Sequence, residues 1–101
     1  TIIVEPGICG FYVTVRAEKG KDKKVKVFLD TECKMVKKML EDIEELDMMA
    51  AFTGHTNNPV YRSAAKHLKH VACPVPSAIL KAIEVELGIA LPKDVKIRFV
   101  K

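Results

Sequence analysis

Apolar and polar residues alternate with the two-residue period of a β-strand in the first third of the chain. Between residues 11 and 18 every second residue is apolar: Phe11, Val13, Val15 and Ala17. After a turn rich in lysine and glycine, residues 24–29 alternate again. Two such runs predict a β-hairpin, with Gly20 supplying the unusual backbone angle of its turn. Residues 2–4 predict a further short strand that stops at Pro6-Gly7.

The apolar period then lengthens to that of a helix. Asp30 or Thr31 is a residue type that caps helix N-termini, and Glu32 brings negative charge to the first turn. From there apolar residues recur at three- and four-residue steps: Cys33, Val36, Leu40, Ile43 and Leu46. The pattern predicts an amphipathic helix that continues to about Ala50, with a solvated acidic face. A polar loop over residues 52–59 and a shorter helix over residues 60–70 follow.

The last third of the chain predicts one more helix and one more strand. The helix opens in Cys73-Pro74-Val75-Pro76-Ser77, because proline fits the first turn of a helix, and Gly88 is suited to end it. Apolar and basic residues alternate over residues 95–99, which predicts a final strand. This order predicts the α+β class. We expect a small, mostly antiparallel sheet, made of the N-terminal hairpin and the C-terminal strand, with two or three helices packed on one face.

The length and composition limit the domain count and the compartment. The chain has 101 residues, of which 49% are hydrophobic, so we expect a single α+β domain over residues 1–101. No apolar run approaches the ~20 residues of a membrane helix. The first residues lack the basic and apolar regions of a signal peptide. Three cysteines without such a signal favour a reducing compartment, so we expect a cytoplasmic protein with no membrane partner.

The net charge is +4, and its lysines are concentrated in one short stretch. They are Lys19, Lys21, Lys23, Lys24 and Lys26. Such a run is typical of a solvated hairpin tip, and it could also bind an acidic partner. The aromatic content is 6% with no tryptophan, and no nucleic-acid motif is present, which argues against a nucleic-acid partner.

The three cysteines are the feature that points to a chemistry. Cys9 lies in a loop between Gly7 and Gly10, Cys33 in the first turn of the long helix, and Cys73 at the start of the last helix. Helix N-termini favour the thiolate over the thiol, and the glycines allow a tight backbone around a ligand. Ordinary core packing is the alternative, since free cysteines are often buried and Cys33 shares an apolar stripe. No pair has the Cys-x-x-Cys spacing of a zinc knuckle or dithiol site.

The spacing Cys9-x23-Cys33-x39-Cys73 resembles that of iron–sulfur cluster assembly scaffolds of the IscU/NifU type. In those small α+β proteins the first cysteine is followed by glycine, as Cys9 is by Gly10, and the other two begin helices. The resemblance implies an iron–sulfur cluster and a protein partner, either a sulfur donor or a cluster acceptor. The chain departs from the family pattern with Phe11 in place of aspartate and Ala72 in place of histidine.

A shorter resemblance concerns Cys73 alone. Cys73-Pro74-Val75-Pro76 is similar to the Cys-Pro-x-Pro motif of TusA-type sulfur carriers, whose cysteine bears a persulfide. This resemblance implies sulfane sulfur at Cys73.

Three thiolates form a reasonable ligand set for an iron–sulfur cluster or zinc, with a fourth ligand from histidine, carboxylate or water. His70 is the nearest histidine to Cys73, one helical turn from His67, and Asp30 lies three residues before Cys33. We therefore expect a non-catalytic scaffold or carrier that binds a cluster, zinc or sulfane sulfur. The alternative is a cofactor-free protein-interaction module that uses its lysine hairpin or a helical face. No hydrolase or transferase motif indicates an enzyme.

Overall fold

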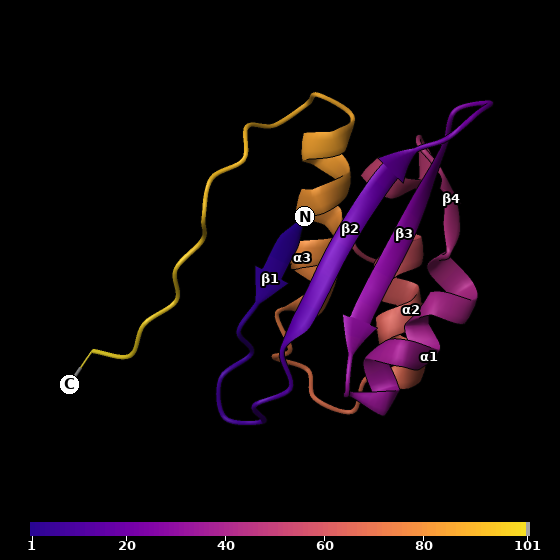
Figure 1. The fold of residues 1–101 in the computed structure, drawn as a ribbon. Coiled ribbons are helices and arrows are strands. Elements are labelled where there is room, and N and C mark those ends of the chain that lie inside the picture. Colours follow the sequence, from indigo (N-terminus) through magenta and orange to yellow (C-terminus); the bar gives the residue numbers. More distant parts are fainter. Residues whose placement is uncertain (101) are drawn as a thin grey trace.

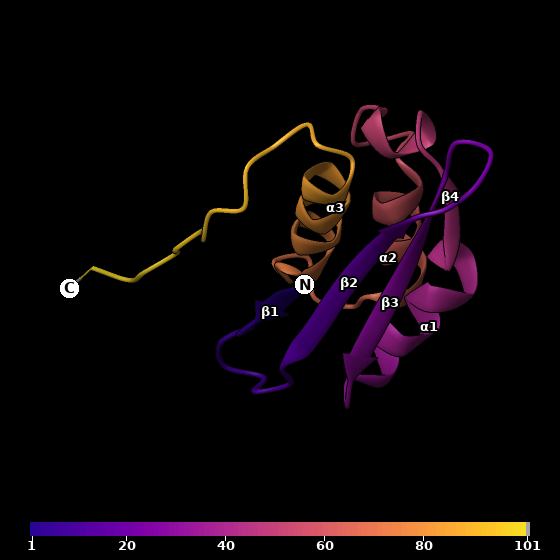
Figure 2. The same cartoon turned by 45° about the horizontal axis from the view of Figure 1, so that its top comes forward.

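Four strands in the order β1-β2-β3-β4 form one antiparallel sheet in a computed structural model, which describes residues 1–100 (Figure 1). The strands are β1 (Ile2–Val4), β2 (Val13–Lys19), β3 (Lys24–Thr31) and β4 (Glu45–Asp47). The helices are α1 (Lys34–Ile43), α2 (Pro59–His67) and α3 (Val75–Glu86), with a short 3-10 helix, η1 (Ala50–Phe52). The helices cover one face of the sheet (Figures 1 and 2), which confirms the α+β class and the antiparallel sheet.

The β2–β3 hairpin forms as its alternation predicts. Val15 pairs with Leu29 and Ala17 with Val27, so these side chains share the face that the helices cover. The turn differs from the expectation. Its left-handed residues are Asp22 and Lys23, with φ of 56° and 60°, and not Gly20. The Lys24 N–H donates to the Lys21 carbonyl across this turn and the Gly20 N–H donates to the Lys24 carbonyl, so three residues, Lys21–Lys23, connect the two strands.

The core lies between the inner face of the hairpin and the two helices α1 and α3. The hairpin contributes Val13, Val15, Val25 and Val27, all buried. The helices contribute Val36, Met39 and Ile43 from α1, and Ile79 and Ile83 from α3. Each of these side chains is almost fully removed from water, so their burial supplies the main stabilising term of the fold.

The long helix ends earlier than the sequence predicts. It stops at Ile43, and the chain continues as β4, which pairs with Lys24–Lys26 of β3. As part of a longer helix, Leu46 would continue the apolar stripe that faces the core. As part of β4 it lies opposite Val25 and is buried in the core as well. Pairing with β3 also gives these residues sheet hydrogen bonds, and α1 has only ten residues.

The predicted C-terminal strand is wrong. Residues 91–100 have no secondary structure, and the segment projects away from the body of the molecule (Figures 1 and 2). Val95, Ile97 and Phe99 alternate as a strand would, but alternation supplies no hydrogen-bonding neighbour. The fourth strand of the sheet is β4 instead.

The second helix is shorter than predicted. It begins at Pro59 after an Asn58 cap, whose Oδ1 accepts a hydrogen bond from the Val60 N–H at 2.9 Å. It ends at His67, so His70 lies in the following loop and the expected pairing of His67 and His70 on one helical turn is wrong. No helix within residues 1–100 is long and apolar enough to cross a membrane.

Asp42, on the exposed acidic side of α1, also joins α1 to α2. Its carboxylate accepts hydrogen bonds from three side chains of α2: Ser63 at 2.8 Å, Lys66 at 3.0 Å and His67 at 2.9 Å. The bond from Ser63, followed by that from Lys66, lowers the pKa of Asp42 from 3.8 to about 2, and the bond from His67 adds to the effect against partial desolvation. The native state therefore favours the ionised form of Asp42.

Truncating the core at α3 should destabilise the whole domain. Ile83 is 0% exposed, so Ile83→Ala leaves a cavity as well as losing buried surface, and we expect it to lower the free energy of unfolding by about 2–5 kcal/mol. Urea denaturation monitored by circular dichroism measures this change. Ile8→Ala is the matched control, since the Ile8 side chain is fully exposed, and it should change the free energy of unfolding very little. Equal losses in both variants would contradict the assigned core.

The Asp42 bonds should make the domain acid-sensitive. Because the folded pKa lies below the ordinary value, the stabilisation is complete above about pH 4 and is lost as the pH falls through about 2. We expect the free energy of unfolding to fall more steeply over this range in the wild type than in Asp42→Asn. Urea titrations at several pH values test this. Glu41→Gln, which removes a neighbouring exposed carboxylate, should keep the wild-type pH profile.

Candidate thiol site

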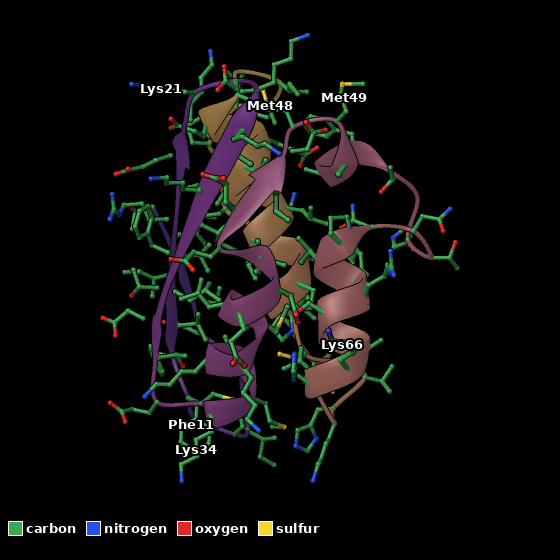
Figure 3. All side chains as sticks on the ribbon, turned by 90° about the vertical axis from the view of Figure 1, so that its right-hand side faces the viewer. Phe11, Lys21, Lys34, Met48, Met49 and Lys66 are labelled. Atoms are coloured by element: carbon green, nitrogen blue, oxygen red, sulfur yellow. The ribbon has the colours of Figure 1, made fainter. Side chains whose placement is uncertain are left out.

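The three cysteines lie in three different connections at the same end of the fold. Cys9 lies between β1 and β2, Cys33 between β3 and α1, and Cys73 between α2 and α3. In Figure 1 these three connections meet at the lower end of the molecule. Figure 3 shows Phe11 and Lys34, close neighbours of Cys9 and Cys33 in sequence, at that same end, while Lys21 of the hairpin tip lies at the opposite end.

Cys9 lies in the tip of an exposed turn. The Gly10 N–H donates to the Gly7 carbonyl at 3.0 Å, which places Ile8 and Cys9 at the two corner positions. Gly7 and Gly10 have φ of 96° and 71°, angles that glycine adopts without strain. The expected role of the glycines in shaping a tight loop is therefore confirmed, and the thiol of Cys9 is open to a reagent or partner.

Cys33 is the N-cap of α1, which therefore begins two or three residues later than a cap at Thr31 or Asp30 predicts. Its N–H donates to the Thr31 hydroxyl at 3.1 Å, and its carbonyl accepts the Lys37 N–H at 3.0 Å. Neither Asp30 nor Thr31 is the cap residue, which corrects the expectation. The side chain is half-buried and packs against the core, as the core-packing alternative expects, and it remains partly accessible.

Cys73 precedes α3 by two residues and is also half-buried against the core. Burial raises the pKa of its thiol, and the Val75 N–H, which donates a hydrogen bond to the sulfur, opposes the rise. The negative charges of Cys33 and Cys9 raise the pKa further. This smaller like-charge effect agrees with three cysteine-bearing connections that share one end of the fold. The raised pKa means that Cys73 favours the thiol form, contrary to the lowered pKa expected at a helix N-terminus.

The candidate fourth ligands are less closely organised. The exposed His70 opens a turn in which the Cys73 N–H donates to the His70 carbonyl at 3.3 Å. Asp30 is exposed near the end of β3, opposite Thr14 of β2. His67 is held by Asp42. Across residues 1–100, no three histidine, cysteine or carboxylate side chains are already arranged to hold one metal ion.

His55 lies in a different surface region. Its ring is 5.0 Å from that of Tyr61, whose hydroxyl is 3.0 Å from the Ser77 hydroxyl. His55 precedes the first turn of α2, whereas His67 ends this helix on the side of the cysteine-bearing connection. His55 is therefore suited to be a control for the histidines near the thiols.

The pKa of Cys73 should fall when a neighbouring cysteine is removed. Cys33→Ser and Cys9→Ser each remove a negative charge that raises this pKa, so Cys73 should be alkylated by iodoacetamide at lower pH in either variant. Rates of alkylation at Cys73, measured by mass spectrometry from pH 7 to pH 10, give the pKa. The control Ser77→Ala leaves all three thiols in place and should not move it. A Cys73 pKa that is the same in both cysteine variants and the wild type would contradict this like-charge effect.

The model of a family of unknown function, DUF6951, matches residues 1–99, so the chain belongs to this family. No curated protein and no solved structure is significantly similar to the chain.

Proposed function

We propose that this member of the DUF6951 family is a non-catalytic scaffold or carrier that holds an iron–sulfur cluster, zinc or sulfane sulfur on Cys9, Cys33 and Cys73. The observation that carries the proposal is that the three connections that bear Cys9, Cys33 and Cys73 all lie at one end of the fold. Three cysteines far apart in sequence have no need to share one end of a domain if they only fill core space.

Three thiolates favour the binding of a soft metal centre or of sulfane sulfur. Thiolates are the usual ligands of iron–sulfur clusters and a common ligand of zinc, and a thiolate is also the group that accepts sulfane sulfur. A bound cation would reverse the electrostatics of the group. The like-charge repulsion that disfavours the thiolate of Cys73 in the free protein would become attraction of all three sulfurs to one positive centre.

The three thiols differ in how firmly the backbone holds them, and this difference suits the binding and release of a cluster, metal or sulfur atom. Cys33 and Cys73 are anchored at the starts of two core helices, whereas Cys9 lies in an exposed glycine-flanked turn. The cysteines therefore offer two positioned sulfurs and one on a turn that can approach them. Such a site is open at its Cys9 side, where a sulfur donor or a cluster acceptor could reach it.

Sulfane sulfur would require only one of the thiols. The Cys73 thiolate attacks the terminal sulfur of a donor persulfide, the donor thiolate leaves, and Cys73 retains the transferred sulfur as a persulfide. The Val75 N–H, which donates to the Cys73 sulfur, would stabilise the attacking anion.

Anaerobic reconstitution tests the proposal. We expect protein treated with iron and sulfide under reducing conditions to develop visible absorption from a bound cluster, or protein incubated with zinc to retain one metal ion per chain after desalting. Cys9→Ser, Cys33→Ser and Cys73→Ser should each lose most of the bound metal, since each removes a thiolate ligand. For sulfane sulfur, mass spectrometry after treatment with a persulfide donor should show one added sulfur atom on Cys73.

The fourth ligand is tested by paired variants. His70→Ala or Asp30→Asn should weaken metal retention if that residue completes the site, while His55→Ala, which alters a histidine in another surface region, should not. Retention of no metal, cluster or persulfide by the wild type, with identical behaviour of the three serine variants, would leave the cofactor-free interaction module as the function.

A further inference from the structure

The C-terminal segment, residues 93–100, has the composition of a strand but no neighbour in its own chain. Ile97 is 82% exposed and Phe99 is 100% exposed, and neither packs against the core. The basic residues Lys96 and Arg98 alternate with the apolar ones. Exposed apolar side chains in such a regular pattern are typical of a surface that binds something.

A second unpaired feature lies on the other side of the sheet, where β3 is longer than its neighbour β4. The β4 ladder covers only Lys24–Lys26, and the Val27 N–H donates to the Glu44 carbonyl. From Phe28 to Thr31, β3 pairs with β2 on one side and has no strand on the other. An unpaired strand edge is a template for another strand.

A groove lies beside this open edge, where α1 ends and β4 begins (Figure 3 faces this side). We call it the acidic groove; its lining residues are Lys26, Val27, Phe28, Glu41, Asp42, Glu44 and Glu45. Asp42 is bonded to α2, but Glu41, Glu44 and Glu45 are exposed and form no ion pair with any residue from 1 to 100. Phe28, 38% exposed, gives the groove an apolar wall.

We propose that the C-terminal segment of one copy of this chain binds in the acidic groove of a second copy, as a strand added to the Phe28–Thr31 edge of β3. The added strand continues the line of β4 along β3, past the point where α1 ends and β4 begins. Its basic side chains lie against Glu41, Glu44 and Glu45, and its apolar side chains cover Phe28. This is strand addition to an open sheet edge, in which backbone bonds give affinity and side chains give specificity.

The geometry of the chain directs the segment to a second copy. The segment leaves α3 on the β1 side of the sheet, whereas α1 and β4, which line the acidic groove, lie on the other side (Figures 1 and 2). The sheet and its helices stand between them. A reciprocal exchange, in which each copy gives its segment and accepts the other, closes as a two-fold dimer and leaves no unfilled groove.

Charge complementarity makes the dimer testable without any cofactor on the thiols. We expect the 101-residue chain to form a dimer in sedimentation equilibrium, weakened by salt because exposed ion pairs are screened. Lys96→Glu combined with Arg98→Glu should raise the dissociation constant at least about tenfold, and Glu41→Lys combined with Glu44→Lys should do the same. Combining all four substitutions should restore most of the wild-type affinity.

The matched control reverses two lysines at the hairpin tip, Lys21→Glu and Lys23→Glu. It should leave the dimer intact, because it changes the net charge as much as Lys96→Glu with Arg98→Glu but alters neither the segment nor a residue that lines the acidic groove. Removal of residues 92–101 should abolish the dimer while the circular dichroism and the thermal midpoint at low concentration stay unchanged. Three results would overturn the proposal. They are a monomeric wild type at high protein concentration, a dimer that survives the removal, and concentration-independent protection of the Val95–Phe99 amides in hydrogen exchange.

Discussion

Burial of the inner face of the β2–β3 hairpin against α1 and α3 is the interaction on which the remaining structure depends. Valines from both strands meet Met39 and Ile43 of α1 and Ile79 and Ile83 of α3 without access to water. Because apolar burial is the main favourable term in folding, this one interface sets the position of every other element. The helices can cover only this face, so the outer face of the sheet remains solvated and carries pairs such as Arg16 over Phe28, at 4.1 Å.

The same packing explains why the cysteine-bearing connections meet. The strands and helices run back and forth across the domain, with α1 and β4 running the same way, so connections that are far apart in sequence fall at the same end (Figure 1). The turns before β2, α1 and α3 share one end, and each carries a cysteine. Cys33 and Cys73 contact the core that holds their helices, and both are only partly buried. Packing and chemistry are therefore compatible roles for the same two residues.

The polar side chains show how the helical layer is held in register. Asp42 receives bonds from one face of α2, where Ser63, Lys66 and His67 are spaced three and four residues apart. That spacing was visible in the sequence, but the carboxylate that it serves lies on another helix. The short β4 limits the sheet at its other edge. It adds Leu46 to the core, and because it pairs only with Lys24–Lys26, the second half of β3 has no strand on that side, beside the acidic groove.

The sequence by itself determined the α+β class, the hairpin, the start of α3 and the loop position of Cys9, because these depend on local periodicity, proline and glycine. It did not determine the end of α1, since Leu46 satisfies a helical stripe and a strand facing the core equally well. Nor did it determine the fate of residues 95–99, because a strand needs a neighbour that only the arrangement of the sheet can supply. The placement of the three cysteine-bearing connections at one end of the fold was likewise decided by the tertiary structure, and burial of Cys73 there raised the pKa of its thiol where helix position alone had indicated a lower one.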